Sequence, residues 1–315
     1  MAFARGAFLG LAFDFDFAAA FLAGLRGAAL ADARAGAGFG VAMLPVAALA
    51  ASCGGGGHGD PGPDAGGAGG SSGAGGGFQI TVDGGTFRAG SVRMAVPAYF
   101  VPGPEWQRII AGAPTVGMIV FNPNSGPGTA TDSGYTRVIG QAQQAGITVL
   151  GYVSTNYGQR AEADILADIN HYYDYYTPSG IYLAEGPMDT DCSAMEAMYH
   201  RLSDAARARD PHAYLAIGTR YCPTYIFFFD LMVQFARGWA EYQTDYAPPS
   251  WMPANSPERF CHFVHDVPAG DGSRALSLAV SNGAGWVFVT DLTDPNPWGV
   301  LPSYFDRELA ALKGQ

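Results

Sequence analysis

Basic residues are scarce in this sequence. The chain has 17 Lys and Arg against 28 Asp and Glu, which gives a formal net charge of −11 and a sequence pI near 4.8. No segment forms the basic stripe with which proteins neutralise phosphates, so the composition argues against nucleic acid as a partner. An acidic chain is compatible with a cationic glycan, but many exported proteins are acidic, and the charge selects no partner by itself.

Cysteine is also scarce, with four in 315 residues. The sequence contains neither a CxxC pair nor an HExxH segment, the spacings typical of metal sites, so it gives no reason to expect a metal or another cofactor. Cys192 and Cys222 follow the fourth and fifth predicted strands, at the same end of neighbouring strands. We predict a disulfide between them, in an oxidising compartment, and a free, buried Cys261.

The apolar stretch over residues 38–51 is too short to cross a bilayer but has the length of a signal-peptide core. The small residues that lead from it into Cys53 are similar to a bacterial lipobox. We therefore predict that residues 1–53 direct export and that Cys53 carries a lipid, the only contact with a membrane; ordinary secretion is the alternative. Both place the protein outside the cytoplasm, as a surface or periplasmic lipoprotein or a secreted protein.

Residues 54–77 are almost all Gly, Ser, Ala, Pro and Asp. Such a segment cannot bury enough apolar surface to offset the entropy of ordering it, which predicts a flexible linker. The remainder, residues 78–315, has 238 residues. That length is close to the roughly 250 residues of a typical (β/α)8 barrel, and we expect one such domain.

Eight apolar runs alternate with helical patterns in this region, and several runs are almost continuously apolar, as in strands buried on both faces. The predicted strands are Arg93–Ala98, Val116–Phe121, Thr148–Val153, Gly180–Leu183, Ala213–Ile217, Leu231–Phe235, Phe260–Val264 and Trp286–Thr290. Alternation of this kind predicts a single α/β domain, a (β/α)8 TIM barrel whose chemistry lies in the loops that follow the strands.

The helical patterns place apolar residues on one face. Over residues 161–176 they recur at spacings of three and four, which predicts one buried stripe. In the next helix Ser193 and Glu196 have the spacing of a capping box, which predicts that the helix begins at Ser193.

Five segments resemble the spherulation-specific family 4, the spherulin-4-like proteins, which include fungal glycoside hydrolases. They are VPAYFVPGPEW (96–106), IVFNPNSGPG (119–128), VLGYVSTNYGQR (149–160), GIYLAEGP (180–187) and VTDLTDPNPWGVLPSYF (289–305). The resemblance implies a (β/α)8 fold with a carbohydrate groove at the C-terminal end of the strands. It also implies a polysaccharide partner, because characterised fungal members cleave an α-1,4-linked galactosamine-containing exopolysaccharide within the chain.

The family pattern has an Asp-Glu pair at the end of the fourth strand and a Glu at the end of the sixth. Here Glu185 matches the second acid of the pair, but Ala184 stands in place of the Asp and Ala236 in place of the sixth-strand Glu. Most glycosidases need two carboxyl groups, and losing one general acid or base typically costs about 10²–10⁴-fold in rate. The resemblance therefore implies impaired hydrolysis.

Three other acids follow strands and are candidates to replace the missing pair: Asp191, Asp266 and Asp291. Asp266 and Asp291 have a more ordinary interpretation, in which they hold loops through hydrogen bonds to backbone N–H groups. Glu241 lies five residues beyond Ala236, and we place it on the following helix.

Aromatic and amide side chains in the same loops suit sugar binding, because ring faces can contact pyranose C–H groups and amides can bond hydroxyls. The candidate substrate-binding residues are Tyr99, Asn122, Asn124, Tyr152, Asn156, Tyr157 and Trp298. Some of these rings are equally suited to packing the rim of the barrel.

Three functions are consistent with the sequence. The favoured hypothesis is an exported, surface-tethered monomer that binds a polysaccharide with impaired or absent hydrolysis. The second is an active endo-glycoside hydrolase that uses Glu185 with Asp191, Asp266 or Asp291. The third is a scaffold or adhesion module with a vestigial groove. The sequence does not identify the polysaccharide or the anomeric outcome.

Overall fold

The computed structural model describes residues 79–82, 85–88, 92–188 and 191–313. All of them belong to one compact unit, Gly76–Gln315. The predicted export segment with Cys53 and the predicted linker lie outside the described residues.

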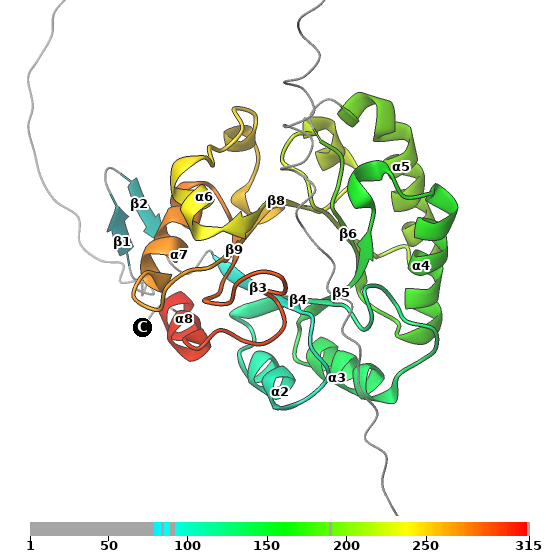
Figure 1. Cartoon of the computed structure of the whole chain (residues 1–315), viewed down its shortest axis with the longest axis horizontal. Helices are drawn as coiled ribbons and strands as arrows, with labels where there is room; N and C mark the ends of the chain where they lie inside the picture. Colours follow the sequence, from blue (N-terminus) through cyan, green and yellow to red (C-terminus); the bar gives the residue numbers. More distant parts are fainter. Residues whose placement is uncertain (1–78, 83–84, 89–91, 189–190, 314–315) are drawn as a thin grey trace, which may run out of the picture. The chain divides into compact units, whose positions relative to one another are not determined.

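Eight parallel strands close into a barrel in the order β10-β3-β4-β5-β6-β7-β8-β9 (Figure 1). They are β3 (Arg93–Ala98), β4 (Val116–Phe121), β5 (Thr148–Ser154), β6 (Gly180–Ala184), β7 (Tyr214–Ile217), β8 (Leu231–Gly238), β9 (Phe260–His265) and β10 (Trp286–Val289). Each predicted strand is present, with ends displaced by at most three residues. The predicted (β/α)8 barrel is confirmed.

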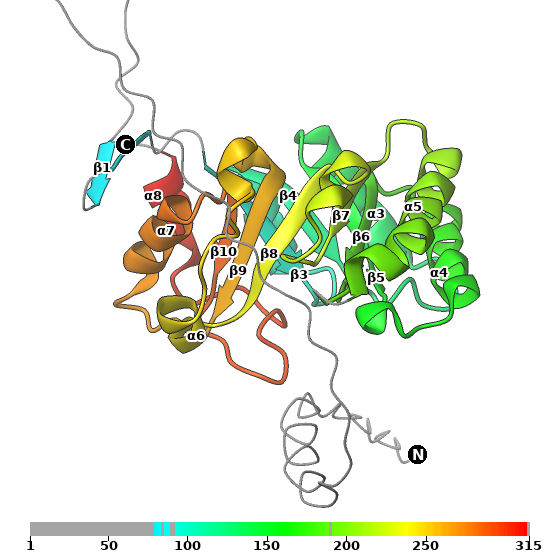
Figure 2. The same ribbon diagram turned by 90° about the horizontal axis from the view of Figure 1, so that it is seen from above.

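Helices follow seven of the eight strands and surround the ring of strands, as Figures 1 and 2 show from two directions. They are α2 (Pro104–Ala111), α3 (Ser133–Gln144), α4 (Glu162–Tyr175), α5 (Cys192–Arg209), α6 (Trp239–Thr244), α7 (Gly272–Ser281) and α8 (Phe305–Leu312). The described chain between β7 and β8 holds only the 3-10 turn η4 (Pro223–Phe227). A short antiparallel hairpin, β1 (Gln79–Val82) and β2 (Gly85–Arg88), precedes the barrel and was not predicted.

Packing between strands and helices follows the predicted stripes. All six residues of β4 are buried, and the Phe121 ring contacts Tyr135 of α3 and Tyr172 of α4, with centroids 5.9 and 5.2 Å apart. The stripe predicted over residues 161–176 is confirmed, because Ile165, Ile169, Tyr172 and Tyr176 are all at most 2% exposed. Burying an aromatic or aliphatic side chain of this size contributes about 1.5–3 kcal/mol.

The predicted capping box is wrong. Helix α5 begins at Cys192, so Ser193 lies inside its first turn and Asp191 occupies the N-cap position. Glu196 instead accepts a hydrogen bond of 2.7 Å from Thr224, which belongs to the connection after β7. Glu241 lies in α6, as expected.

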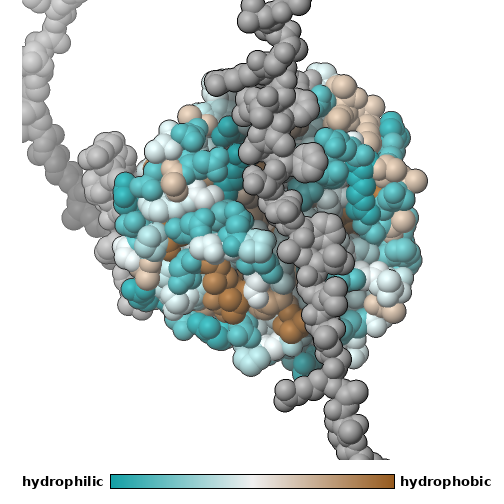
Figure 3. All heavy atoms as spheres, in the orientation of Figure 1, coloured by the Kyte–Doolittle hydropathy of each residue, from teal (hydrophilic) through white to brown (hydrophobic). Residues whose placement is uncertain are grey.

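Figure 3 shows a surface on which hydrophilic residues dominate and apolar residues occupy small areas. In the described chain the strongly exposed large apolar side chains are Val101, Tyr157, Met188, Phe227 and Val300. All but Phe227 lie in loops at the C-terminal end of the barrel, which we call the mouth. No helix among the described residues is long and apolar enough to cross a membrane.

Candidate functional site at the barrel mouth

Glu185 follows the last residue of β6 and is the acid at the centre of the candidate site. Its carboxylate accepts a hydrogen bond of 2.5 Å from the Ser154 hydroxyl and one of 3.3 Å from the Tyr152 hydroxyl, both on β5. Its backbone carbonyl accepts from the Tyr157 amide at 2.7 Å and from the Thr155 hydroxyl at 2.6 Å. Strand β5 and the loop after it therefore fix both the backbone and the side chain of Glu185.

The backbone of Glu185 has φ of +55°, in the left-handed region that favours glycine. Asp266, directly after β9, has φ of +59°. Such conformations cost a residue with a Cβ about 1–2 kcal/mol and cluster at functional sites. Two acids at the mouth are thus held in strained conformations.

The residues paired across the strands with Ala184 and Ala236, the two alanines at positions where the resemblance implies acids, carry no charge. Ala184 is paired with Ser154 across β5 and β6 and is 4% exposed. Ala236 is paired with Phe263 across β8 and β9 and is exposed. The exposed position 236 therefore has room for a larger side chain.

One side of the mouth holds three tyrosines whose rings contact one another. Tyr99 and Tyr152 have centroids 5.2 Å apart, and Tyr152 and Tyr182 have centroids 6.3 Å apart. Burial and the neighbouring Glu185 carboxylate raise the pKa of Tyr152, and burial also raises the pKa of Tyr99 and Tyr182. These phenols stay protonated at neutral pH, so Tyr152 acts as a hydrogen-bond donor to Glu185 and is unsuited to act as a phenolate nucleophile.

Trp298 borders the mouth next to Tyr99 and packs as part of a second aromatic group. Its ring lies 5.8 Å from both Phe263 and His265 and 6.1 Å from Phe288. Its backbone carbonyl accepts a hydrogen bond from the Tyr99 amide at 3.1 Å, which ties the loop after β10 to the end of β3. The partly exposed indole therefore both packs the rim and borders the mouth.

The three alternative acids differ in what holds them. Both carboxylate oxygens of Asp291 accept hydrogen bonds from Ser303, one from the amide at 3.1 Å and one from the hydroxyl at 2.5 Å. Asp266 is exposed and lies 3.0 Å from the His265 imidazole. Asp191 is half-buried at the start of α5, and its side chain makes no capping bond. Asp291 thus holds its loop through hydrogen bonds, one of them to a backbone N–H group, which is one of the two roles predicted for it.

The remaining candidates differ in how free they are to bind a ligand. Asn122 uses its carbonyl oxygen within its own loop, accepting from the Gly126 amide at 2.7 Å. Asn124, Asn156 and Tyr157 are exposed. Asn124 also borders a hollow of about 550 Å³ between the loops after β3 and β4.

A larger hollow of about 730 Å³ lies at the opposite end of the barrel, among residues that precede β5, β6 and β7. Barrel enzymes place their chemistry at the C-terminal end of the strands, so size alone does not make this hollow the functional site.

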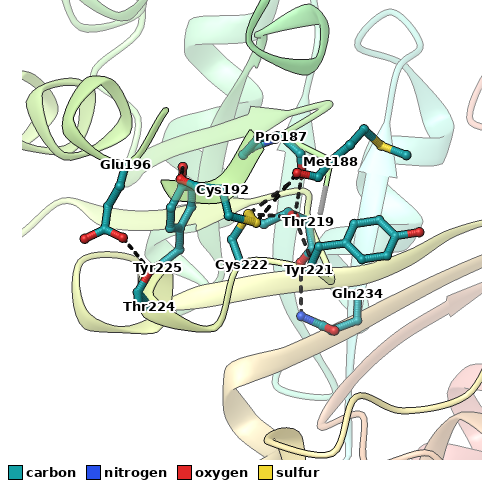
Figure 4. The surroundings of a disulfide bond; sticks show 10 residues. All are labelled: Pro187, Met188, Cys192, Glu196, Thr219, Tyr221, Cys222, Thr224, Tyr225 and Gln234. Carbon is teal, nitrogen blue, oxygen red and sulfur yellow. Dashed lines mark hydrogen bonds between the residues drawn. A yellow bond between two sulfur atoms is a disulfide. The ribbon is translucent and has the colours of Figure 1, made fainter. Parts of the chain in front are cut away.

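A disulfide joins Cys192 to Cys222 and connects the loops after β6 and β7 (Figure 4), while Cys261 is buried and free. Around it, the Pro187 carbonyl accepts from the Thr219 hydroxyl at 3.0 Å, and the Thr219 carbonyl accepts from the Gln234 amide at 3.0 Å. The segment directly after Glu185 is therefore braced against β7 and β8.

Sequence reasoning missed three residues that shape the site. Ser154 makes the shortest hydrogen bond to Glu185, His265 contacts Asp266, and Arg237 at the end of β8 pairs with Glu241 at 2.9 Å. Their position at strand ends was visible in the sequence, but which loops face each other depends on the path of the chain between strands.

Comparisons with known proteins agree with the barrel fold. A family model for spherulation-specific family 4 matches residues 93–312. Spherulin-4 from Physarum polycephalum is 30% identical over 236 residues, which cover 70% of this chain and 70% of that protein. The crystal structure of Aspergillus clavatus Sph3 in complex with GalNAc matches with a TM-score of 0.60 and 24% identity, over 70% of this chain and 97% of that chain.

The structural match shows a shared fold, and the family model with the spherulin-4 relative shows descent within one family. The barrel, with its strand-end loops and the acid after β6, lies inside the matched region. The chain belongs to spherulation-specific family 4.

Proposed function

We propose that this protein binds a polysaccharide at the mouth of its barrel and hydrolyses it poorly or not at all. The observation that carries the proposal concerns the family's acid positions: Glu185 is present and accepts hydrogen bonds from Ser154 and Tyr152, whereas positions 184 and 236 carry alanine. Family membership and the GalNAc held by the Sph3 relative support a carbohydrate ligand, with a galactosamine-containing polymer as the first to test.

The chemistry supports binding over cleavage. A glycosidase needs one carboxylic acid to protonate the leaving oxygen and a second carboxylate to attack or to activate water. Glu185, which accepts hydrogen bonds from two hydroxyls, can supply one of these two groups. Alanine at 184 and 236 supplies no second group.

An active endo-glycoside hydrolase is the second candidate, because one observation favours it. Glu185 and Asp266 share the strained left-handed backbone that clusters at active sites. In this reading Glu185 works with Asp266, Asp191 or Asp291. The Ser303 hydrogen bonds to Asp291 make it the weakest of the three partners.

We also propose that the protein is exported as a monomer and tethered to a membrane surface only through a lipid on Cys53. The Cys192–Cys222 disulfide supports an oxidising compartment. Cells that express the protein with labelled palmitate should incorporate label into the native chain and not into Cys53→Ser. Equal labelling of both proteins would contradict the tether.

Binding is tested by affinity electrophoresis of the whole protein in gels that contain a galactosamine-containing exopolysaccharide, with reducing ends measured in the same samples. The native protein should be retarded without releasing reducing ends, and Tyr157→Ala should lose at least half of the retardation. The matched control is His212→Ala, an exposed residue that precedes β7 at the opposite end of the barrel. Release of reducing ends by the native protein would favour the hydrolase, and absence of retardation would contradict both.

A further inference from the structure

The hollow of about 550 Å³ between the loops after β3 and β4 has a polar lining of hydroxyl and amide groups. Among the described residues that line it, Asp132 is the one acid and none is basic. Ligand sites commonly have volumes of about 300–1,000 Å³, so this hollow is large enough to hold sugar residues. We call it the side hollow.

Both walls of the side hollow begin two residues from predicted sugar-binding residues. Val101 follows Tyr99 by two positions, and Asn124 follows Asn122 by two positions. Consecutive Cα atoms are about 3.8 Å apart, so each pair of Cα atoms lies within about 7.6 Å. Tyr99 belongs to the tyrosine group that contacts Glu185. A polysaccharide chain bound at the candidate site can therefore continue into the side hollow.

The polar side chains of the side hollow are free to bind a ligand. Four of them make no side-chain hydrogen bond to any described residue: Asn124, Thr129, Thr131 and Ser133. The larger hollow at the opposite end of the barrel differs, because Gln143 there donates to Ser179 at 3.2 Å and Arg209 pairs with Asp174. A ligand in the larger hollow would compete with these internal bonds, whereas one in the side hollow would not.

The charge of the side hollow disfavours an acidic ligand. Helix α3 begins here at Ser133, and a helix N-terminus attracts anions unless its amides are occupied. They are occupied, because the Asp132 carboxylate accepts from the Gly134 amide at 2.7 Å and the Asp132 carbonyl accepts from the Thr136 amide at 3.0 Å. The carboxylate keeps its negative charge in this bond. The side hollow therefore suits neutral or cationic groups, such as the hydroxyls and amines of an amino sugar.

The wall that the loop after β4 supplies is braced by hydrogen bonds. The Asn122 side chain accepts from the Gly126 amide at 2.7 Å. The Tyr176 hydroxyl donates to the Pro127 carbonyl at 3.1 Å. A wall fixed in this way loses little conformational entropy when a ligand binds, which favours affinity.

We infer that the side hollow is a second sugar-binding site, which holds further residues of the polysaccharide chain bound at Glu185. The inference rests on the proposed binding function and extends the binding surface beyond the candidate site. The side chains of Asn124, Thr129 and Thr131 bond hydroxyls or amines of the sugar. Val101, whose side chain is 74% exposed at the edge, contacts sugar C–H groups. The sugar residues bound here are neutral or carry an amine, as in a galactosamine-containing polymer.

The test measures binding of the whole protein to a galactosamine-containing exopolysaccharide and to a disaccharide prepared from it. The native protein should bind the polymer at least tenfold more tightly than the disaccharide. The triple variant Asn124→Ala/Thr129→Val/Thr131→Val removes three hydrogen-bonding groups from the side hollow. Its affinity for the polymer should fall at least tenfold, because each lost hydrogen bond weakens binding severalfold. Its affinity for the disaccharide should match that of the native protein.

The matched control is Thr148→Val/His212→Ala, which removes polar groups from the larger hollow and should leave both affinities unchanged. The single variant Thr131→Val should lose about threefold in affinity for the polymer, which keeps the test valid if the triple variant unfolds. Equal affinity of the native protein for polymer and disaccharide would overturn the inference and leave carbohydrate binding intact. A triple variant that binds the polymer like the native protein, or that loses both affinities equally, would do the same. A native protein that binds neither ligand would overturn the inference and contradict the proposed function as well.

Discussion

At the scale of single residues, Glu185 combines a strained backbone with a carboxylate that accepts two hydrogen bonds. Its φ of +55° disfavours any residue with a Cβ, yet β5 supplies two hydroxyl donors to its side chain. Strain of this kind persists when surrounding contacts over-determine the conformation. The contacts from β5 thus hold Glu185 in a conformation that costs stability.

Two substitutions of Glu185 separate the cost of its left-handed backbone from the loss of its side-chain hydrogen bonds. Glu185→Gly and Glu185→Ala both lose the hydroxyl contacts, but only alanine keeps a Cβ in the left-handed region. Chemical denaturation should find Glu185→Ala less stable than Glu185→Gly by about 1 kcal/mol. Equal stabilities would mean that the left-handed backbone is not retained in the variants.

The buried carboxyl group of Glu308 on α8 should make the stability of the folded protein depend on pH. It is 3% exposed, and neither carboxyl oxygen has a hydrogen-bond partner among the described residues. Burial, with Asp291 nearby, raises its pKa from 4.5 to about 9. The folded state therefore holds a proton that the unfolded chain releases above pH 4.5, and stability falls as the pH rises from there toward 9.

Replacing Glu308 by glutamine should remove this pH dependence. Between pH 4.5 and 7.5 the native protein should lose on the order of 3–4 kcal/mol from this group, since one pKa unit corresponds to about 1.4 kcal/mol. Urea denaturation should find Glu308→Gln more stable than the native protein at pH 8 and not at pH 4. Glu258→Gln, at an exposed site, serves as the control. A native protein at least as stable as Glu308→Gln at pH 8 would contradict the assignment.

At the scale of elements, the connection between β7 and β8 stands out. It holds the 3-10 turn η4 where the other strands are followed by an α-helix, and it carries one end of the Cys192–Cys222 disulfide. The same connection carries Arg220, whose guanidinium lies over the Tyr221 ring. The crosslink to α5 thus compensates for a connection with little helical packing of its own.

Removing this crosslink should lower the free energy of unfolding, because the unfolded chain regains the entropy that the closed loop had removed. The cysteines are 30 residues apart, and restricting a loop of that length in the unfolded chain is worth about 3–4 kcal/mol in the chain-entropy model. Cys192→Ser/Cys222→Ser should show this loss in denaturation curves, and a reductant should then have no further effect. A reductant that leaves the native protein's stability unchanged would contradict a stabilising disulfide.

At the scale of the whole molecule, most of the barrel could be predicted from the sequence because buried parallel strands are apolar along their whole length. Strand β4, with all six residues buried, shows the principle. The β1–β2 hairpin was missed, and the capping-box spacing of Ser193 and Glu196 misplaced the start of α5, because Glu196 bonds Thr224 from a distant connection. Local spacing carries no information about such a partner.

The candidate site was predictable in part for the same reason. Glu185 and the aromatic loops follow predicted strands, so their gathering at one end of the barrel follows from the fold. The hydrogen bonds from Ser154 and Tyr152 to Glu185 were not predictable, because the sequence pattern does not specify which side chains of neighbouring strands meet.

The most direct test of the central claim restores the missing acids. The native protein and Ala184→Asp/Ala236→Glu are compared for reducing-end release from a galactosamine-containing exopolysaccharide. Each acid contributes about 10²–10⁴-fold in rate, so the double variant should exceed the native protein by at least about 100-fold. Adding Glu185→Gln to the double variant should abolish that gain. A native protein that already cleaves the polymer at a rate the double variant does not raise would contradict the account.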